Sequence, residues 1–313
     1  MSTTRKLEGV GLGLRLALLD DLLAAGPEAR ALRWLECHPE NYMRRGGRFP
    51  EGLRRCRERW PFATHGLAMS LGGVDPFDPA YMTTLARFLG ELEVPWHSDH
   101  LCFSVAHRAA THDLLPLPFN QESVEHLVRR IREAQDRLPV PLAIENVSYY
   151  VTPPGSDLDE GEFVDAVVRE SGCALMLDVN NVFVNAANHG HDPKAILARM
   201  PLDRVVQIHV AGHDYEEPPV RGADGTMGGG FILDTHAQPV RDEVYELLAW
   251  TLERTGKVPI LLERDDDFPA FDVLLAEVNR LDAIWQAAPE RPRLTSASTS
   301  ASTSAGARRA GAR

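Results

Sequence analysis

Short runs of apolar residues, each ended by one ionisable side chain, recur along the chain. Three of the runs end in carboxylates, at Glu145, Asp178 and Glu263, and two end in imidazoles, at His65 and His209. A run of about four to six apolar residues between polar ones is typical of a strand that is buried on both faces, as in a parallel sheet. Each of these strand ends needs a partner, because an unpaired buried carboxylate is costly. The pattern therefore predicts a parallel sheet with a polar site at the ends of its strands.

Strand-like and helix-like segments alternate along the body of the chain. The expected strands cover residues 8–15, 31–37, 61–67, 94–100, 141–147, 173–179, 204–211 and 258–264, and the expected helices cover residues 16–25, 51–59, 79–92, 121–138, 160–171, 193–200, 239–255 and 269–286. Asp78, Asn120 and Asp192 stand where helix N-caps are expected. Eight such units predict an α/β protein with a closed (β/α)8, or TIM, barrel. An open doubly wound sheet fits less well, because polar groups end most of the strands instead of gathering at one switch point.

The barrel is expected to form a single catalytic domain over residues 8–290. Residues 1–7 are expected to be a flexible N-terminus, and residues 291–313 a disordered tail rich in Ser, Thr, Ala and Arg. In the first strand, glycines at every second position, from Gly9 to Gly13, leave one face bare, as at a crowded barrel interior. Residues 212–233 form a long loop, which favours a functional role for this segment.

Net charge, cysteine spacing and hydropathy indicate which partners and which cellular location to expect. A net charge of −12 argues against a nucleic-acid partner. The four cysteines show no C-x-x-C spacing, which predicts reduced thiols and a cytoplasmic location. No run reaches the roughly 18 apolar residues of a membrane span, and no signal peptide is evident, so no membrane association is expected.

In a closed barrel the C-terminal ends of all strands meet at one face, so strand-end side chains that are distant in sequence should meet in space. The polar residues at these ends and in the following loops are Glu36, His38, His65, His97, Asp99, His100, Glu145, Asp178, Asn181, His209, His213, Asp234, His236 and Glu263. Imidazoles and carboxylates without thiolates suit Fe, Mn or Zn. Because these groups exceed the needs of one ion, we predict a multinuclear site whose carboxylates bridge metals about 3.5–4 Å apart.

Each of these residues also has a plainer explanation. A strand-end glutamate more often pairs with an arginine or lysine than binds a metal, and His65 could be a buried core histidine. The coincidence of five consecutive strand ends with a ligand-type residue, from the third strand onward, favours the metal. His97 and His100 cannot both face the site from a regular strand, because they are an odd number of residues apart.

Two polar segments near the predicted site are candidates for substrate binding. Glu40, Asn41 and Tyr42 follow the second strand, and Asn180 and Asn185 belong to an amide-rich loop after the sixth. The amides could hydrogen-bond to a peptide backbone. Both segments could equally use these side chains to satisfy the backbone of their own loops.

Taken together, the motifs resemble those of the multinuclear non-haem iron-dependent oxidative enzymes, typified by the oxidase of methanobactin biosynthesis. The matching motifs are His-Gly at 65–66, Ser-Asp-His-Leu at 98–101, Ile-Glu-Asn at 144–146, Leu-Asp-x-Asn-Asn-Val at 177–182, His-x-Ala-Gly-His at 209–213, Asp-x-His at 234–236 and Leu-Glu-Arg at 262–264. The match runs from about Gly9 to Ala287, and the motifs are specific only as a set. The wider superfamily includes xylose isomerase-like barrels and trinuclear zinc apurinic endonucleases.

The resemblance implies a TIM barrel that binds two or three Fe ions of mixed Fe(II) and Fe(III) state. The ligands that it suggests are His65, His100 and a bridging Glu145 for the first metal, Asp178, His209 and Glu263 for the second, and Asn181, Asp234 and His236 for the third. It favours His100 over His97 as the ligand. Catalytic roles would fall to Glu145, Asp178 and His213, the last as a ligand or as an acid–base group.

Members of this family use dioxygen to oxidise cysteine residues of ribosomally made precursor peptides. The resemblance implies the same activity here, with a separate partner protein that recruits the peptide. One alternative is a zinc- or manganese-dependent hydrolase or isomerase of the same superfamily, acting on sugars or nucleic acid. Another is a non-catalytic peptide-binding scaffold, which would leave the strand-end ligands unexplained.

Overall fold

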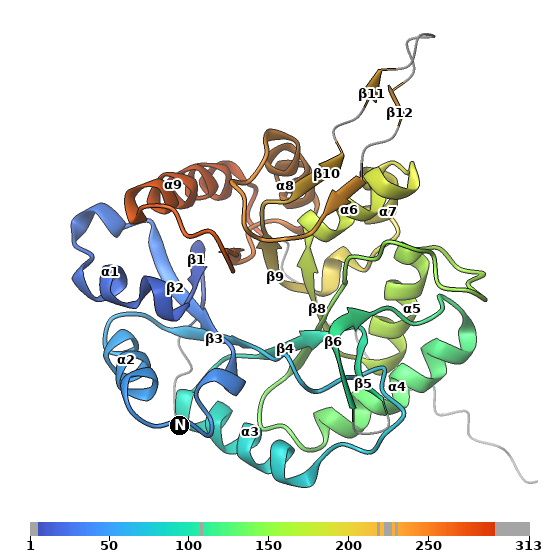
Figure 1. The fold of residues 1–313 in the computed structure, drawn as a ribbon, viewed down its shortest axis with the longest axis horizontal. Helices are drawn as coiled ribbons and strands as arrows, with labels where there is room; N and C mark the ends of the chain where they lie inside the picture. Colours follow the sequence, from blue (N-terminus) through green and yellow to red (C-terminus); the bar gives the residue numbers. More distant parts are fainter. Residues whose placement is uncertain (1–5, 107–108, 218–219, 222–226, 229–230, 292–313) are drawn as a thin grey trace, which may run out of the picture.

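The structure is a computed structural model that describes residues 6–106, 109–217, 220–221, 227–228 and 231–291. Eight parallel strands close into a barrel in the order β1, β2, β3, β4, β7, β8, β9 and β14 (Figure 1). Their bounds are β1 Val10–Gly13, β2 Leu32–Cys37, β3 Phe62–His65, β4 His97–His100, β7 Leu142–Glu145, β8 Ala174–Asp178, β9 Val205–Val210 and β14 Ile260–Leu262. The predicted (β/α)8 barrel is confirmed. The expected flexible N-terminus and disordered tail fall outside the described residues, apart from residues 6–7 and 291.

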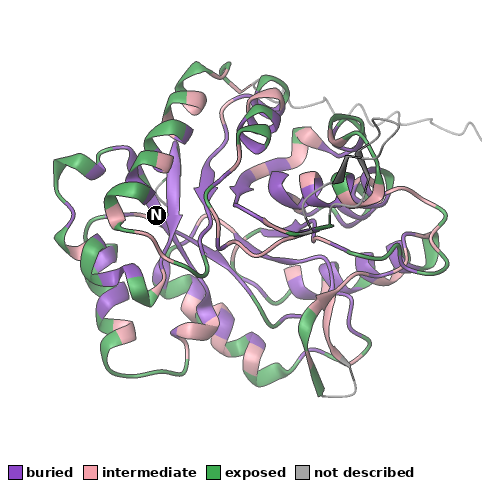
Figure 2. Ribbon diagram, turned by 45° about the horizontal axis from the view of Figure 1, so that its top comes forward, coloured by how far each residue is buried: buried purple, intermediate pink, exposed green. Residues whose placement is uncertain are grey.

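The α-helices of the described residues lie outside the barrel and turn an apolar face toward it. They are α1 Leu19–Ala24, α2 Arg48–Arg57, α3 Pro79–Leu92, α4 Gln121–Gln135, α5 Glu160–Ser171, α6 Val179–His189, α7 Pro193–Leu197, α8 Asp242–Thr255 and α9 Phe271–Ala287. Figure 2 shows these helices exposed on their outer sides, while the barrel strands are buried. The side chains of Asp78, Asn120 and Asp192 accept hydrogen bonds from the first turns of α3, α4 and α7, so the predicted N-caps are confirmed.

One large aromatic side chain occupies part of the barrel interior. Trp34 is fully buried and clusters with Leu7, Ala63 and Leu261. A Cβ atom on Gly11 would lie 2.4 Å from the Trp34 indole, so the bare strand face that the sequence predicts is the space this ring occupies. Its Nε1 donates a hydrogen bond to the Gly9 carbonyl at 3.3 Å.

The segment that follows β8 differs from its prediction. The segment from 180 to 189, expected as an amide-rich loop, is the helix α6. The Asp178 side chain accepts a hydrogen bond from the Asn181 N–H at 2.7 Å and caps its start, and Gly190 ends it in the left-handed region, with φ at 71°. Burial of Val182 and Ala186 outweighs the weak helix propensity of the asparagines.

The loops above the strand ends form two-stranded ribbons. These are β5 Phe103–Ala106 with β6 Ala109–Leu115, β10 Asp214–Glu217 with β13 Phe231–Leu233, and β11 Val220–Arg221 with β12 Met227–Gly228. The long 212–233 segment therefore contains ribbons where a plain loop was expected. Across the described ranges, no helix combines the length and apolarity that a membrane crossing requires.

Candidate metal centre

Three side chains from successive strand ends form a first compact group. His65 ends β3, His100 ends β4 and Glu145 ends β7, and all three are buried. Glu145 Oε2 lies 3.3 Å from His65 Nε2 and 3.1 Å from His100 Nε2. One ligand atom from each residue lies within 4.8 Å of the others, which is compatible with a single shared cation.

A second buried group adjoins the first and shares Glu145 with it. Its other members are Asp178 at the end of β8, His209 on β9 and Glu263 after β14. His209 Nδ1 lies 3.0 Å from Glu263 Oε2 and 3.4 Å from Glu145 Oε1. The two oxygens of Glu145 therefore face different groups, which is the arrangement expected of a bridging carboxylate.

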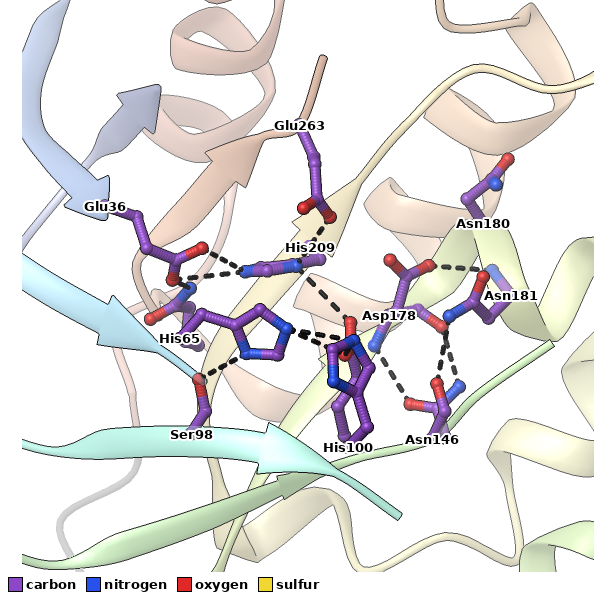
Figure 3. A network of polar contacts seen from close by, with 12 residues as sticks. Glu36, His65, Ser98, His100, Asn146, Asp178, Asn180, Asn181, His209 and Glu263 are labelled. Carbon is purple, nitrogen blue, oxygen red and sulfur yellow. Dashed lines mark hydrogen bonds and ion pairs between the residues drawn. The ribbon is translucent and has the colours of Figure 1, made fainter. Parts of the chain in front are cut away.

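The backbone around Asp178 leaves one of its oxygens free for the site. Its Oδ1 caps α6, and Asn146 pairs with the Asp178 backbone through two hydrogen bonds of 2.9 Å (Figure 3). Asp178 Oδ2 and Asn181 Oδ1 are buried and have no hydrogen-bond partner within the described residues. Such orphaned oxygens are costly, and a cation beside them would satisfy both. The residues present therefore fit a metal, and the donor set suits Fe, Mn or Zn.

The residues expected around a third metal are only partly brought together. Asp234 Oδ1 lies 2.8 Å from His236 Nε2 and accepts a hydrogen bond from the Asn180 amide at 2.7 Å. Asp234 Oδ2 accepts a further hydrogen bond from the Ser148 hydroxyl at 3.0 Å. His236 Nδ1 lies 3.4 Å from Glu263 Oε2, so this pair adjoins the second group. A third compact set contains His38, Glu263 and Asp265 instead.

Two other histidines of the sequence analysis lie apart from these groups. His97 is buried, and its Nδ1 lies 3.1 Å from the Thr64 hydroxyl, so the structure places His100 and not His97 beside His65. His213 is also buried, and its Nδ1 lies 2.8 Å from Asn180 Oδ1. His213 therefore contacts Asp234 only indirectly, through the Asn180 amide.

Mutual charge interactions set the protonation of the metal-free site. Burial alone lowers the pKa of His65, but the Glu145 carboxylate outweighs it and raises that pKa to about 9. For His209, burial is likewise outweighed by Glu36 and Glu263, so its pKa lies well above the usual value. Burial raises the pKa of Glu145, but His65 and His100 reverse this effect and hold that pKa below its usual range.

These shifts predict that metal uptake depends on pH. His65 must lose its proton before Nε2 can bind a cation, and its pKa is about 9 in the metal-free protein. We expect the apparent metal affinity to rise as the pH increases toward 9, with proton release on binding. Calorimetric metal titrations in buffers of different ionisation enthalpy measure both quantities. An affinity that does not change between pH 6 and 9, with no proton release, would contradict the prediction.

An open cavity of about 740 Å³ lies above the first group. Its floor includes His65, His100 and Glu145, and its walls come from the β5–β6 hairpin, residues 148–151 and residues 234–236. The Tyr150 ring, part of this wall, packs against Phe231 of β13 with ring centroids 5.3 Å apart. The candidate centre is therefore accessible from the C-terminal face of the barrel.

The side chains expected to bind substrate lie elsewhere. Glu40, Asn41, Tyr42, Asn180 and Asn185 are all described, and none lines this cavity. Glu40 Oε1 accepts hydrogen bonds from the Leu67 N–H at 3.1 Å and the Tyr81 hydroxyl at 2.7 Å.

Asn185 and Tyr42 also have partners within the protein. Asn185 Oδ1 accepts from the Tyr149 N–H at 2.8 Å, and Tyr42 is buried against Phe88. Glu40 and Asn185 therefore hydrogen-bond to neighbouring loops, as the alternative explanation of these segments has it, and their contact with substrate stays a prediction.

The sequence analysis did not identify Arg15, whose positively charged side chain lies beside Glu263 of the second group. Arg15 Nη2 lies 3.0 Å from Glu263 Oε1, and Arg15 Nε donates a hydrogen bond to Asp265 Oδ1 at 2.7 Å. Because Arg15 forms ion pairs with both Glu263 and Asp265, the set with His38 is better described as an ion-pair cluster than as a metal site. The signal was present: an arginine follows the first strand, and closure of the barrel places that strand beside β14.

The fold, a closed barrel with buried imidazoles and carboxylates at its C-terminal mouth, is similar to that of several solved TIM barrels. D-psicose 3-epimerase from Clostridium cellulolyticum is similar, with a TM-score of 0.53 and 10% identity over 90% of this chain and 96% of that one. Endonuclease IV from Thermus thermophilus gives a TM-score of 0.52 and 18% identity over 89% and 98% of the two chains. At these identities the likeness concerns the fold alone.

Residues 9–286 match the family described as "RiPP precursor modification enzyme MbnB/TglH/ChrH", where RiPP denotes a ribosomally synthesised and post-translationally modified peptide, and the chain belongs to this family. A UPF0276 protein of Pseudomonas aeruginosa (strain UCBPP-PA14) is 43% identical over 275 residues, covering 88% of this chain and 92% of the relative. A UPF0276 protein of Neisseria meningitidis serogroup C is 41% identical over 279 residues, with 88% and 94% covered. The predicted resemblance is confirmed, and membership implies an enzyme.

Proposed function

We propose that the chain is a multinuclear non-haem iron-dependent oxidase that uses dioxygen to modify cysteine residues of a ribosomally synthesised precursor peptide. A separate partner protein would recruit the peptide. One observation carries this proposal: two buried ligand groups share Glu145 beneath an open cavity of about 740 Å³. Family membership supports the peptide substrate. A non-catalytic scaffold is disfavoured because the family consists of modification enzymes.

The chain's own residues give the two metal positions different charges. The first group offers the imidazoles of His65 and His100 with one shared carboxylate, whereas the second has three carboxylates and a single imidazole. More anionic ligands favour the more highly charged cation, so the second position suits Fe(III) better. When bound, iron would supply a binding site for the cysteine thiolate and for dioxygen, and would accept electrons from the substrate.

The cavity determines how a peptide can approach. Its floor is buried, while Tyr150 and Val151 on its wall are 39% and 74% exposed and offer apolar contacts near the mouth. A cysteine side chain is short, so the backbone that carries it must enter the cavity itself, which the β5–β6 hairpin, residues 148–151 and residues 234–236 line. The polar floor, with apolar side chains such as Tyr150 and Val151 on the wall, suits a thiol flanked by ordinary peptide.

Metal analysis tests the proposal directly. We expect protein purified without chelators to contain two or three irons per chain, and an iron-57 sample to show coupled Fe(II) and Fe(III) signals in Mössbauer spectra. Stoichiometric zinc, with no iron bound even after anaerobic loading, would replace the proposal by the zinc or manganese hydrolase or isomerase alternative. Protein that binds no metal under either condition would exclude both reactions.

A further inference from the structure

A chain of buried polar side chains approaches His209 from the side opposite Glu263. This hydrogen-bonded series leads from Trp96 through Gln207 to Glu36 and His209. Gln207, Glu36 and His209 are fully buried. We propose that Glu36 is a positioning residue that keeps a proton on His209 Nε2 and thereby makes Nδ1 the metal-binding atom. The inference rests on the metal site proposed above and concerns how the chain prepares it.

The direction of each hydrogen bond follows from the first donor. An indole N–H can only donate, so Trp96 Nε1, 2.9 Å from Gln207, must face the amide oxygen. The Gln207 NH2 group then points to Glu36 Oε2 at 2.6 Å and donates to it. Glu36 Oε2 is therefore a hydrogen-bond acceptor. The indole donor therefore determines which end of the Gln207 amide is the oxygen and which is the nitrogen.

The same logic extends to His209. Its Nε2 lies 3.1 Å from Glu36 Oε1 and 3.3 Å from Oε2, so Nε2–H donates to the carboxylate. Nδ1, on the other edge of the ring, faces Glu263 and Glu145 at 3.0 and 3.4 Å (Figure 3). A carboxylate on the far nitrogen of a metal-binding histidine fixes the ring and increases the basicity of the ligand nitrogen. Nδ1 is therefore the atom left for the cation.

His65 is oriented by the same principle with a weaker partner. The Ser98 hydroxyl donates to the Thr64 carbonyl at 3.3 Å, so its oxygen accepts from His65 Nδ1–H at 2.9 Å. His65 Nε2 is then left to face Glu145. The two groups thus differ beyond their ligands, because a carboxylate supports His209 in the second group and a neutral hydroxyl supports His65 in the first.

Replacement of Glu36 by glutamine tests the proposal. Because Trp96 fixes the Gln207 amide, the new side chain must turn its oxygen toward Gln207 and its NH2 toward His209 Nε2. That NH2 would move the histidine proton to Nδ1 and block the ligand atom. We expect Glu36→Gln to lower the affinity for the second metal by about 10–100-fold, while one metal still binds.

Removal of the indole donor should reverse this loss. In the Glu36→Gln, Trp96→Phe double variant the Gln207 amide can flip, so residue 36 can again accept from Nε2–H, and we expect about 10-fold of the affinity to return. Trp96→Phe alone should change metal affinity little. A structural defect at Glu36 would not be repaired by a second core substitution, so the rescue separates positioning from mere stability.

Nitrogen-15 NMR spectra of the full-length, zinc-loaded protein report which ring nitrogen of each histidine binds the metal. This measurement depends neither on activity nor on the folding of a variant. We expect one histidine bound through Nδ1 with Nε2 protonated, in contrast to His65, which should bind through Nε2. Binding of His209 through Nε2, or wild-type affinity in Glu36→Gln, would overturn this inference alone. Wild-type protein that binds no metal would instead refute the proposed function.

Discussion

Replacement of Glu145 by glutamine should remove more than one metal ion per chain and abolish activity. The two Glu145 oxygens face different groups, with Oε2 near His65 and His100 and Oε1 near His209. An amide offers one weak oxygen donor and no charge, so both groups lose their shared ligand at once. Elemental analysis of the purified variant, compared with wild type, measures the effect.

Glu160 offers a matched control for this substitution. It is also a buried carboxyl group, but burial raises its pKa to about 8, so it is already largely uncharged at pH 7. It accepts a hydrogen bond from the Asn185 amide at 3.1 Å and belongs to neither ligand group. Glu160→Gln should therefore keep the wild-type metal content. If Glu145→Gln also kept it, the residue would be an ion-pair partner and the shared-ligand interpretation would be wrong.

The sequence was most informative where strand ends carry the chemistry. Parallel strands in a closed barrel bring their C-terminal ends to one face, so the spacing of apolar runs was enough to predict that Glu145, Asp178 and His209 would meet. Parity along the strand allowed only one of His97 and His100 to face the site, the family motif favoured His100, and the structure places only His100 in the first group. These predictions depend on topology, which local patterns specify well.

Predictions that depended on side-chain direction within loops were weaker. Asn185 was expected to face substrate, and it hydrogen-bonds to the Tyr149 backbone and the Glu160 carboxyl group from within the helix α6. Asparagine is ambiguous in sequence because it serves ligands and its own backbone equally well. The roles of Glu36 and Arg15 also required three dimensions, because their partners at 209 and 263 are distant along the chain.

The tryptophan beneath the centre should have the largest effect on stability. Trp34 is 0% exposed and packs between Leu7, Ala63 and Leu261 inside the barrel. Trp34→Ala would leave a cavity that closed strands cannot collapse to fill, and we expect the free energy of unfolding to fall by about 3–5 kcal/mol. Chemical denaturation followed by circular dichroism measures it. The half-buried Trp250 on α8 is the control, and Trp250→Ala should cost clearly less.

A double-variant cycle with Gly11 tests whether this cost comes from filling the barrel. A methyl group at Gly11 would lie 2.4 Å from the indole, so Gly11→Ala alone should destabilise the protein through overpacking. In the Trp34→Ala background the same methyl enters the vacated space, and its cost should fall by about 0.5–3 kcal/mol or change sign. Trp250→Ala should show no such coupling. Additive effects of the substitutions at 11 and 34 would mean that the two strands relax independently. The Trp34 ring would then not set the spacing between β1 and β2, on which the positions of Glu36 and Arg15 depend.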